Sequence, residues 1–139
     1  GLVPGRAGRF VIDMGRYKEE LLRKARDVGA RRVFVAGDDA ETAEDMVSFC
    51  ASEGLTPLFD RGEGRTSKDN SALMTLTHSV NVTQYALDAI SNVELLASAG
   101  HLVGTFGSHF TRLAHEVSFA RGGYKTPPVT LDVHWFVNP

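Results

Sequence analysis

HLVGTFGSHFTRLAHEVSFAR, residues 101–121, is the stretch of sequence that decides the fold. Residues 101–104 are an apolar run with the length of a buried strand. Residues 105–109 are small and polar around Gly107, where the backbone can turn sharply. A strand that turns into a helix N-terminus presents free backbone N–H groups, so this stretch predicts an anion site, most often one for phosphate. The helix is predicted from apolar side chains at helical spacing, which are Phe110, Leu113, Ala114 and Val117.

Two interpretations of this turn are open. In the first, Ser108 donates to a bound anion, and the side chain of Arg112 folds back over this anion from one helical turn further on. In the second, the stretch is an ordinary strand–turn–helix unit in which Ser108 caps the helix and Arg112 lies in solvent, because most such turns bind nothing.

The rest of the chain repeats the same alternation of strand and helix patterns. Asp13 is expected to cap the first helix and Gly29 to end it. The alternation predicts an α/β fold, a Rossmann-like parallel sheet with helices on both faces. Residues 1–9 are expected to be a flexible lead-in and residues 10–139 a single domain. The apolar runs of strand length are residues 10–12, 32–36, 55–59, 101–104 and 129–136.

Two of the predicted helices carry a clear apolar face. The one after residue 39 places Cys50 on that face with Ala43, Met46 and Val47, so this cysteine is expected to be a buried small hydrophobe rather than a nucleophile. The one over residues 81–99 places Ala86, Ile90, Val93 and Ala97 on one face.

Composition excludes several classes of partner. The 139 residues are 42% hydrophobic and 23% charged and carry a net charge of −2. The chain therefore has no general basic field, and nucleic acid is not expected as a partner. No apolar run approaches the length of a membrane span, so no membrane contact is expected. The five histidines show no metal-ligand spacing, and no metal site is predicted.

A pair of aspartates follows the predicted strand at residues 32–36. Asp38 and Asp39 come after Gly37, at the carboxyl end of that strand, where open α/β sheets bind their ligands. If this strand neighbours the one at residues 101–104, the aspartates and the anion-binding turn share one crevice. Helix capping explains the same pair equally well, because a helix N-terminus favours carboxylates. A metal is a weaker explanation, since no further oxygen ligands are placed.

Two segments of the chain resemble a known family. Residues 94–117, ELLASAGHLVGTFGSHFTRLAHEV, are similar to the C-terminal nucleotide-sugar-binding half of the α-1,6-fucosyltransferase-like superfamily. Its members have a strand that ends in a Thr-Phe-Ser-Ser-like turn, followed by a helix with Arg, a small residue and Glu. Residues 31–42, RRVFVAGDDAET, resemble the family's strand that ends in Thr-Asp-Asp or Ser-Asp-Asp. The matching positions are Thr105, Phe106, Gly107, Ser108, Arg112, Ala114 and Glu116.

The resemblance implies a fold and a function. The fold is one lobe of a GT-B-like glycosyltransferase, and the reaction is inverting transfer of a sugar from a GDP-sugar such as GDP-fucose to a glycan acceptor, without a metal or other cofactor. The turn would hold the diphosphate through N–H and hydroxyl donors of Gly107, Ser108 and His109, beside Thr105, Phe106 and Arg112. Asp38 and Asp39 would be the catalytic pair that lines the donor–acceptor crevice. Asn92 stands where the family's aspartate pairs with the guanine edge.

The chain also departs from the family. An amide at Asn92 accepts at only one atom, whereas a carboxylate takes two guanine N–H bonds. The family's His-x-Arg-Arg-like run, whose arginine neutralises the departing diphosphate, does not occur. We therefore expect the nucleotide-binding half of a larger glycosyltransferase, partnered by an N-terminal lobe of the same protein. Because positioning and stabilisation of the leaving group supply most of such catalysis, the chain alone is expected to turn over poorly or not at all.

Other functions fit the same sequence. The first is a non-catalytic Rossmann-like module that binds a protein partner. The second is another nucleotide- or phosphate-binding α/β protein, because a fold does not fix a function. The cellular compartment does not follow from the residues themselves; the Golgi lumen applies if the protein behaves as the eukaryotic members of the superfamily do.

Overall fold

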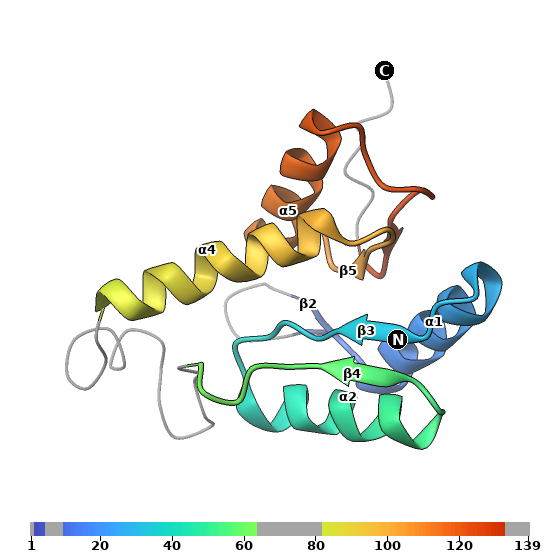
Figure 1. Cartoon of the computed structure of the whole chain (residues 1–139). Coiled ribbons are helices and arrows are strands. Elements are labelled where there is room, and N and C mark those ends of the chain that lie inside the picture. The colour runs from blue at the N-terminus through green and yellow to red at the C-terminus, as the bar shows by residue number, and fades with distance from the viewer. Residues whose placement is uncertain (1, 5–9, 64–81, 133–139) are drawn as a thin grey trace. The chain divides into compact units, whose positions relative to one another are not determined.

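A computed structural model describes residues 2–4, 10–63 and 82–132 of the chain. The chain splits into two compact units: unit 1 comprises Gly1–Gly29 and Val93–Pro139, and unit 2 comprises Ala30–Asn92. The elements in chain order are β1 (Leu2–Pro4), β2 (Phe10–Ile12), α1 (Met14–Val28), β3 (Arg32–Phe34), α2 (Ala40–Ser52), β4 (Thr56–Leu58), α4 (Val82–Ser98), β5 (Val103–Gly104), α5 (His109–Ala120) and β6 (Val129–Thr130) (Figure 1).

Unit 2 is built on a pair of parallel strands joined by a helix. β3 pairs with β4, with Val33 opposite Pro57, and α2 connects them and runs alongside β4 (Figure 1). The pairing continues past the strands, since the N–H of Val35 donates to the carbonyl of Leu58 at 3.0 Å. A crossover helix between parallel strands is what the sequence predicts here.

The predicted buried face of α2 is confirmed. It consists of Ala43, Met46, Val47 and Cys50. Cys50 is fully buried, and burial raises the pKa of its thiol. A thiol that is buried and held protonated is a poor nucleophile, so Cys50 acts as a core side chain.

Unit 1 combines an antiparallel pair of strands, a parallel pair and helices. β1 pairs antiparallel with β2, and β5 pairs parallel with β6. Both predicted ends of α1 are confirmed: the Asp13 side chain accepts from the N–H of Gly15 at 3.2 Å, and Gly29 adopts the left-handed conformation with a φ of 67°. The parallel pair is extended by the N–H of Leu131, which donates to the carbonyl of Gly104 at 3.0 Å.

The described residues therefore form an α/β protein with four helices and small parallel sheets. Among them each sheet has two strands, whereas the sequence predicts one larger parallel sheet. The strands are also shorter than the predicted apolar runs. Part of the predicted lead-in, Leu2–Pro4, forms β1. Residues 1, 5–9 and 133–139 lie outside the described part of the chain, and with them the end of the predicted strand at residues 129–136.

The apolar face predicted for α4 is correct only in its C-terminal half. Val93 and Ala97 are buried, whereas Ala86 is exposed and Ile90 is 61% exposed. Helical periodicity shows which side of a helix is apolar, but it does not show how much of the helix length is covered by other side chains.

One histidine of unit 1 has a pKa below its ordinary value. His101 precedes β5, and its Nδ1 lies 2.8 Å from the hydroxyl of Thr126. Desolvation by burial lowers the pKa of His101, and the nearby charges of Lys24 and Lys125 lower it further. Protonation of His101 is therefore easier in the unfolded chain than in the folded one.

This shift predicts a pH-dependent stability. Because the folded-state pKa lies below the ordinary value of 6.5, the unfolded state takes up more protons as the pH falls through 6.5, and the free energy of unfolding decreases. We expect His101→Asn, which keeps a polar partner for Thr126, to lose less stability than the wild type between about pH 8 and pH 5. Urea denaturation across this pH range measures how the free energy of unfolding depends on pH in the wild type and in the variant. Parallel pH profiles for the two proteins would contradict the prediction, and equal stability at about pH 8 shows that the substitution itself is tolerated.

Candidate anion-binding site

The candidate site begins where β5 ends. Residues 105–108, called here the 105–108 turn, connect β5 to α5, and the turn is closed by the N–H of Ser108, which donates to the carbonyl of Thr105 at 3.2 Å. Gly104 lets α5 approach the strand closely, since a Cβ at this position would lie 2.7 Å from the Cγ2 of Thr111. A larger residue at Gly104 would push the start of α5 away from β5.

Two N–H groups of the turn hold an internal carboxylate. The N–H of Phe106 donates to Oδ1 of Asp132, and the N–H of Gly107 donates to Oδ2, each at 2.7 Å. These distances are typical of charge-assisted hydrogen bonds. In this structure the turn therefore binds a carboxylate of the chain itself.

Sequence reasoning did not identify Asp132. A signal for it exists, because Asp132 follows β6, which pairs parallel with β5. The carboxyl ends of parallel strands meet at the same edge of a sheet, so a carboxylate after β6 lies near the turn after β5.

The side chains of Thr105 and Phe106 stabilise the turn from within unit 1. Thr105 is hydrogen bonded to the phenol of Tyr17 on α1. Burial raises the pKa of Tyr17, the charge of Asp132 raises it further, and the hydrogen bond from Thr105 opposes this shift. The Phe106 ring is only 3% exposed and packs against His115, with ring centroids 5.3 Å apart. Both side chains are thus part of the support of the turn.

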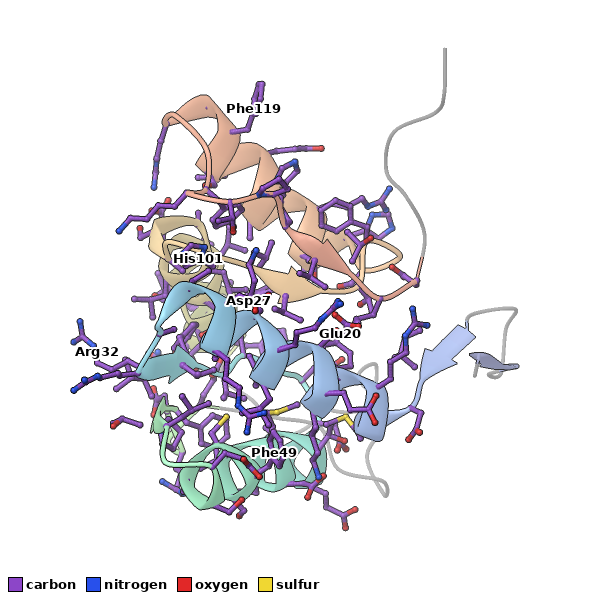
Figure 2. The ribbon with its side chains drawn as sticks, turned by 90° about the vertical axis from the view of Figure 1, so that its right-hand side faces the viewer. Glu20, Asp27, Arg32, Phe49, His101 and Phe119 are labelled. Atoms are coloured by element: carbon purple, nitrogen blue, oxygen red, sulfur yellow. The ribbon has the colours of Figure 1, made fainter. Side chains whose placement is uncertain are left out.

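The support extends along α5 as a row of rings. His115 also stacks on Tyr124 at 6.1 Å, and Phe119 lies at 6.5 Å from it. The Tyr124 hydroxyl lies 3.1 Å from the carbonyl of Leu96, which ties α4 to the chain that follows α5. Phe119 itself is 75% exposed and projects from α5 (Figure 2).

The N-terminus of α5 lacks a side-chain cap. Ser108 occupies the N-cap position, but its side chain makes no capping hydrogen bond. The N-caps of α1 and α2 differ from that of α5, because the side chains of Asp13 and Asp39 each accept a hydrogen bond from a backbone N–H. The first N–H groups of any helix have no acceptor within the helix, and they carry the positive end of its dipole. The Ser108 hydroxyl stands beside these donors.

His109 and Arg112 lie on the first turn of α5. The guanidinium of Arg112 donates to Nδ1 of His109, so the two side chains are hydrogen bonded to each other. The arginine charge lies near the helix N-terminus, where it adds to the positive potential that favours an anion.

The remaining predicted site residues belong to unit 2. The Asp39 side chain accepts from the N–H of Thr42 at 2.8 Å and so caps α2, which is the capping alternative raised from the sequence. Asp38 is exposed on the approach to this helix. Asn92 is 9% exposed, and its amide donates to the carboxylate of Glu63. The 105–108 turn, His109 and Arg112 belong to unit 1.

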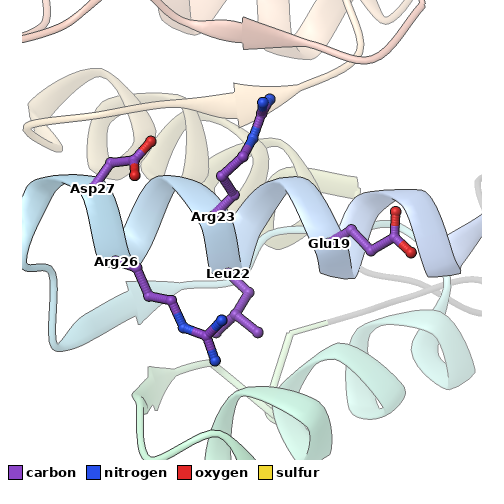
Figure 3. Close-up of a pocket in the computed structure, with 5 residues that line it drawn as sticks. All are labelled: Glu19, Leu22, Arg23, Arg26 and Asp27. Atoms are coloured by element: carbon purple, nitrogen blue, oxygen red, sulfur yellow. The ribbon is translucent and has the colours of Figure 1, made fainter.

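A shallow pocket of about 290 Å³ lies along α1 (Figure 3). Its charges balance, and none of the predicted site residues lines it. No group of three or more metal-ligating side chains occurs among residues 2–4, 10–63 and 82–132. The residues that line the pocket are Glu19, Leu22, Arg23, Arg26 and Asp27.

Comparison of the chain with protein-family models, with curated proteins and with solved structures finds no match. Within the part of the chain that the structure describes, every helix is too short or too polar to cross a membrane.

Proposed function

We propose that this chain is the donor-binding domain of a fucosyltransferase-like glycosyltransferase, with a Rossmann-like fold. The proposal rests on one observation: the segment that resembles the family's nucleotide-sugar-binding segment forms a strand, an anion-binding turn and a helix whose N-terminus has no side-chain cap. A diphosphate suits this arrangement because a helix N-terminus offers several N–H donors and a positive potential.

The donors available to a diphosphate lie on the α5 side of the turn. They are the Ser108 hydroxyl, the N–H groups of the first turn of α5 and the guanidinium of Arg112. In the transfer, an acceptor hydroxyl would attack the anomeric carbon of the sugar and lose its proton to a carboxylate or to water. The bond from that carbon to the diphosphate would break, and GDP would leave with the electron pair of that bond. Donors held at the diphosphate stabilise the negative charge that develops there.

Unit 2 carries the residues proposed to contact the acceptor and the guanine base, Asp38 and Asn92. Asp39 already caps α2, so Asp38 is the stronger candidate of the two for contact with the acceptor. The Asn92 amide N–H is bonded to Glu63, so recognition of guanine would use Oδ1 of Asn92, which can accept from a guanine N–H. The glycan acceptor and the N-terminal lobe of the same protein complete the proposal as partners.

A second candidate function is a non-catalytic module that binds a protein partner. It is favoured by Phe119, a large apolar side chain that is 75% exposed. Binding of GDP at the 105–108 turn separates the two, because a protein-binding module has no need of a nucleotide donor.

Calorimetric titration of the 139-residue chain with GDP tests the proposal. We expect saturable binding that Ser108→Ala weakens by about 10- to 100-fold, because a hydroxyl bonded to a charged group contributes about 1.5–3 kcal/mol. Ser98→Ala, at the exposed end of α4, is the matched control and should leave the affinity unchanged.

UDP and ADP distinguish the parts of the site. Equal binding of all three nucleotides would keep the diphosphate at the turn and reject guanine recognition by Asn92. Failure of this chain to bind any of them would reject the proposed donor site.

A further inference from the structure

We infer that Asp132 is a positioning residue of the anion site: its carboxylate fixes the 105–108 turn and confines a bound diphosphate to Ser108 and the first turn of α5. This inference rests on the proposed function. It assigns a role to a residue outside the segments that resemble the family, and it states which donors of the turn a ligand can use.

The carboxylate occupies the first two donors of the turn completely. Oδ1 and Oδ2 of Asp132 each accept one N–H at 2.7 Å, from Phe106 and Gly107. The carboxylate also excludes a side chain at position 107, since a Cβ there would lie 2.5 Å from Oδ2. A phosphate oxygen bound at these N–H groups would have to expel Asp132.

The position of Asp132 is itself fixed by the core of unit 1. Leu131, the preceding residue, is 1% exposed, and its N–H donates to Gly104 at 3.0 Å. Tyr17 of α1 lies close enough to interact electrostatically with Asp132 and is hydrogen bonded to Thr105 at the start of the turn. The turn is therefore held from α1, from β5 and from the chain after β6.

A fixed turn improves anion binding at the neighbouring donors. A mobile turn would have to be ordered when the ligand binds, and that ordering would reduce the affinity. The negative charge of Asp132 acts in the opposite sense, because it repels a second anion. The two effects predict opposite changes in GDP affinity when Asp132 is replaced. A weaker affinity indicates that Asp132 positions the turn, and a stronger affinity indicates that its charge competes with the bound anion.

The experiment measures GDP binding to the full chain and to Asp132→Ala and Asp132→Asn. If Asp132 positions the turn, both variants bind GDP about tenfold more weakly or worse, even though each removes a negative charge. The amide introduced by Asp132→Asn cannot replace the carboxylate, because it offers an acceptor to only one of the two N–H groups. Asp27→Asn, which removes an exposed charge from α1 in the same unit, is the matched control and should bind GDP as the wild type does.

Amide NMR spectra provide a readout that does not depend on affinity. In the wild type, GDP is expected to shift the amides of Ser108, His109 and Phe110 much more than those of Phe106 and Gly107. In Asp132→Asn, the amides of Phe106 and Gly107 should move without ligand, while the remaining spectrum shows a folded protein.

The outcomes separate the inference from the proposed function. Variants that bind GDP as tightly as the wild type, or more tightly, would overturn the positioning role and leave the donor site intact. Displacement of Asp132 by GDP, seen as large ligand-induced shifts at Phe106 and Gly107, would also overturn it. A wild-type chain that binds no GDP would reject the proposed function and the positioning role together.

Discussion

Replacing Leu131 by alanine lowers the free energy of unfolding by about 2–5 kcal/mol, the range measured for truncation of a buried leucine. Leu131 is 1% exposed and is one of the largest fully buried side chains of the described chain. The truncation removes apolar surface from the core and leaves a cavity beside the end of the β5–β6 pair. Chemical denaturation monitored by circular dichroism measures the change.

Leu113→Ala is the matched control for this prediction. Leu113 is 49% exposed on α5, so the same change of side chain is expected to cost about 1 kcal/mol or less. Equal losses of stability in the two variants would show that Leu131 is not a core residue in solution.

Gly107→Ala is expected to have the second large effect, because it expels the Asp132 carboxylate from the turn. The new Cβ would lie 2.5 Å from Oδ2, a distance that real Cβ contacts do not show, so the carboxylate must move. The N–H groups of Phe106 and Gly107 then lose a charged acceptor, and each such hydrogen bond contributes about 1.5–3 kcal/mol. The measurement is again the free energy of unfolding.

A double-mutant cycle with Asp132→Ala tests this mechanism directly. If Gly107→Ala acts by expelling the carboxylate, it adds little once Asp132 is gone, and the two losses are strongly non-additive. Gly37→Ala serves as the control, since its Cβ would meet only the Ala43 methyl group at an ordinary 3.8 Å. Fully additive losses at Gly107 and Asp132 would show that the two residues act independently.

The local structure of the chain could be predicted from its sequence to a large extent. Asp13 and Gly29 mark the ends of α1, and Cys50 lies in the buried face of α2. The strand, turn and helix over residues 101–121 also form as predicted. These features depend on interactions between residues close in sequence, such as caps, left-handed glycines and helical periodicity, and such interactions are visible in the order of the residues.

Features that depend on contacts distant in sequence could not be predicted. The occupant of the 105–108 turn is a carboxylate 25 residues after Gly107, and no local pattern connects the two. Asn92 is bonded to Glu63, 29 residues before it, and no local pattern connects these two residues either. The exposure of Ile90 has the same origin, since burial is decided by what else packs on the helix face.

The tie between Gly107 and Asp132 has a consequence for the synthesis of this protein. A ribosome releases the chain from its N-terminus, so the 105–108 turn leaves the ribosome before the carboxylate that completes it. The 25 residues that follow Gly107, ending with Asp132, must be released before the loop can close, and closure then bears the entropic cost of bringing its ends together. Until that point the N–H groups of the nascent turn are open to any anion of the cell, and the mature donor geometry is one of the last local features of this segment to form.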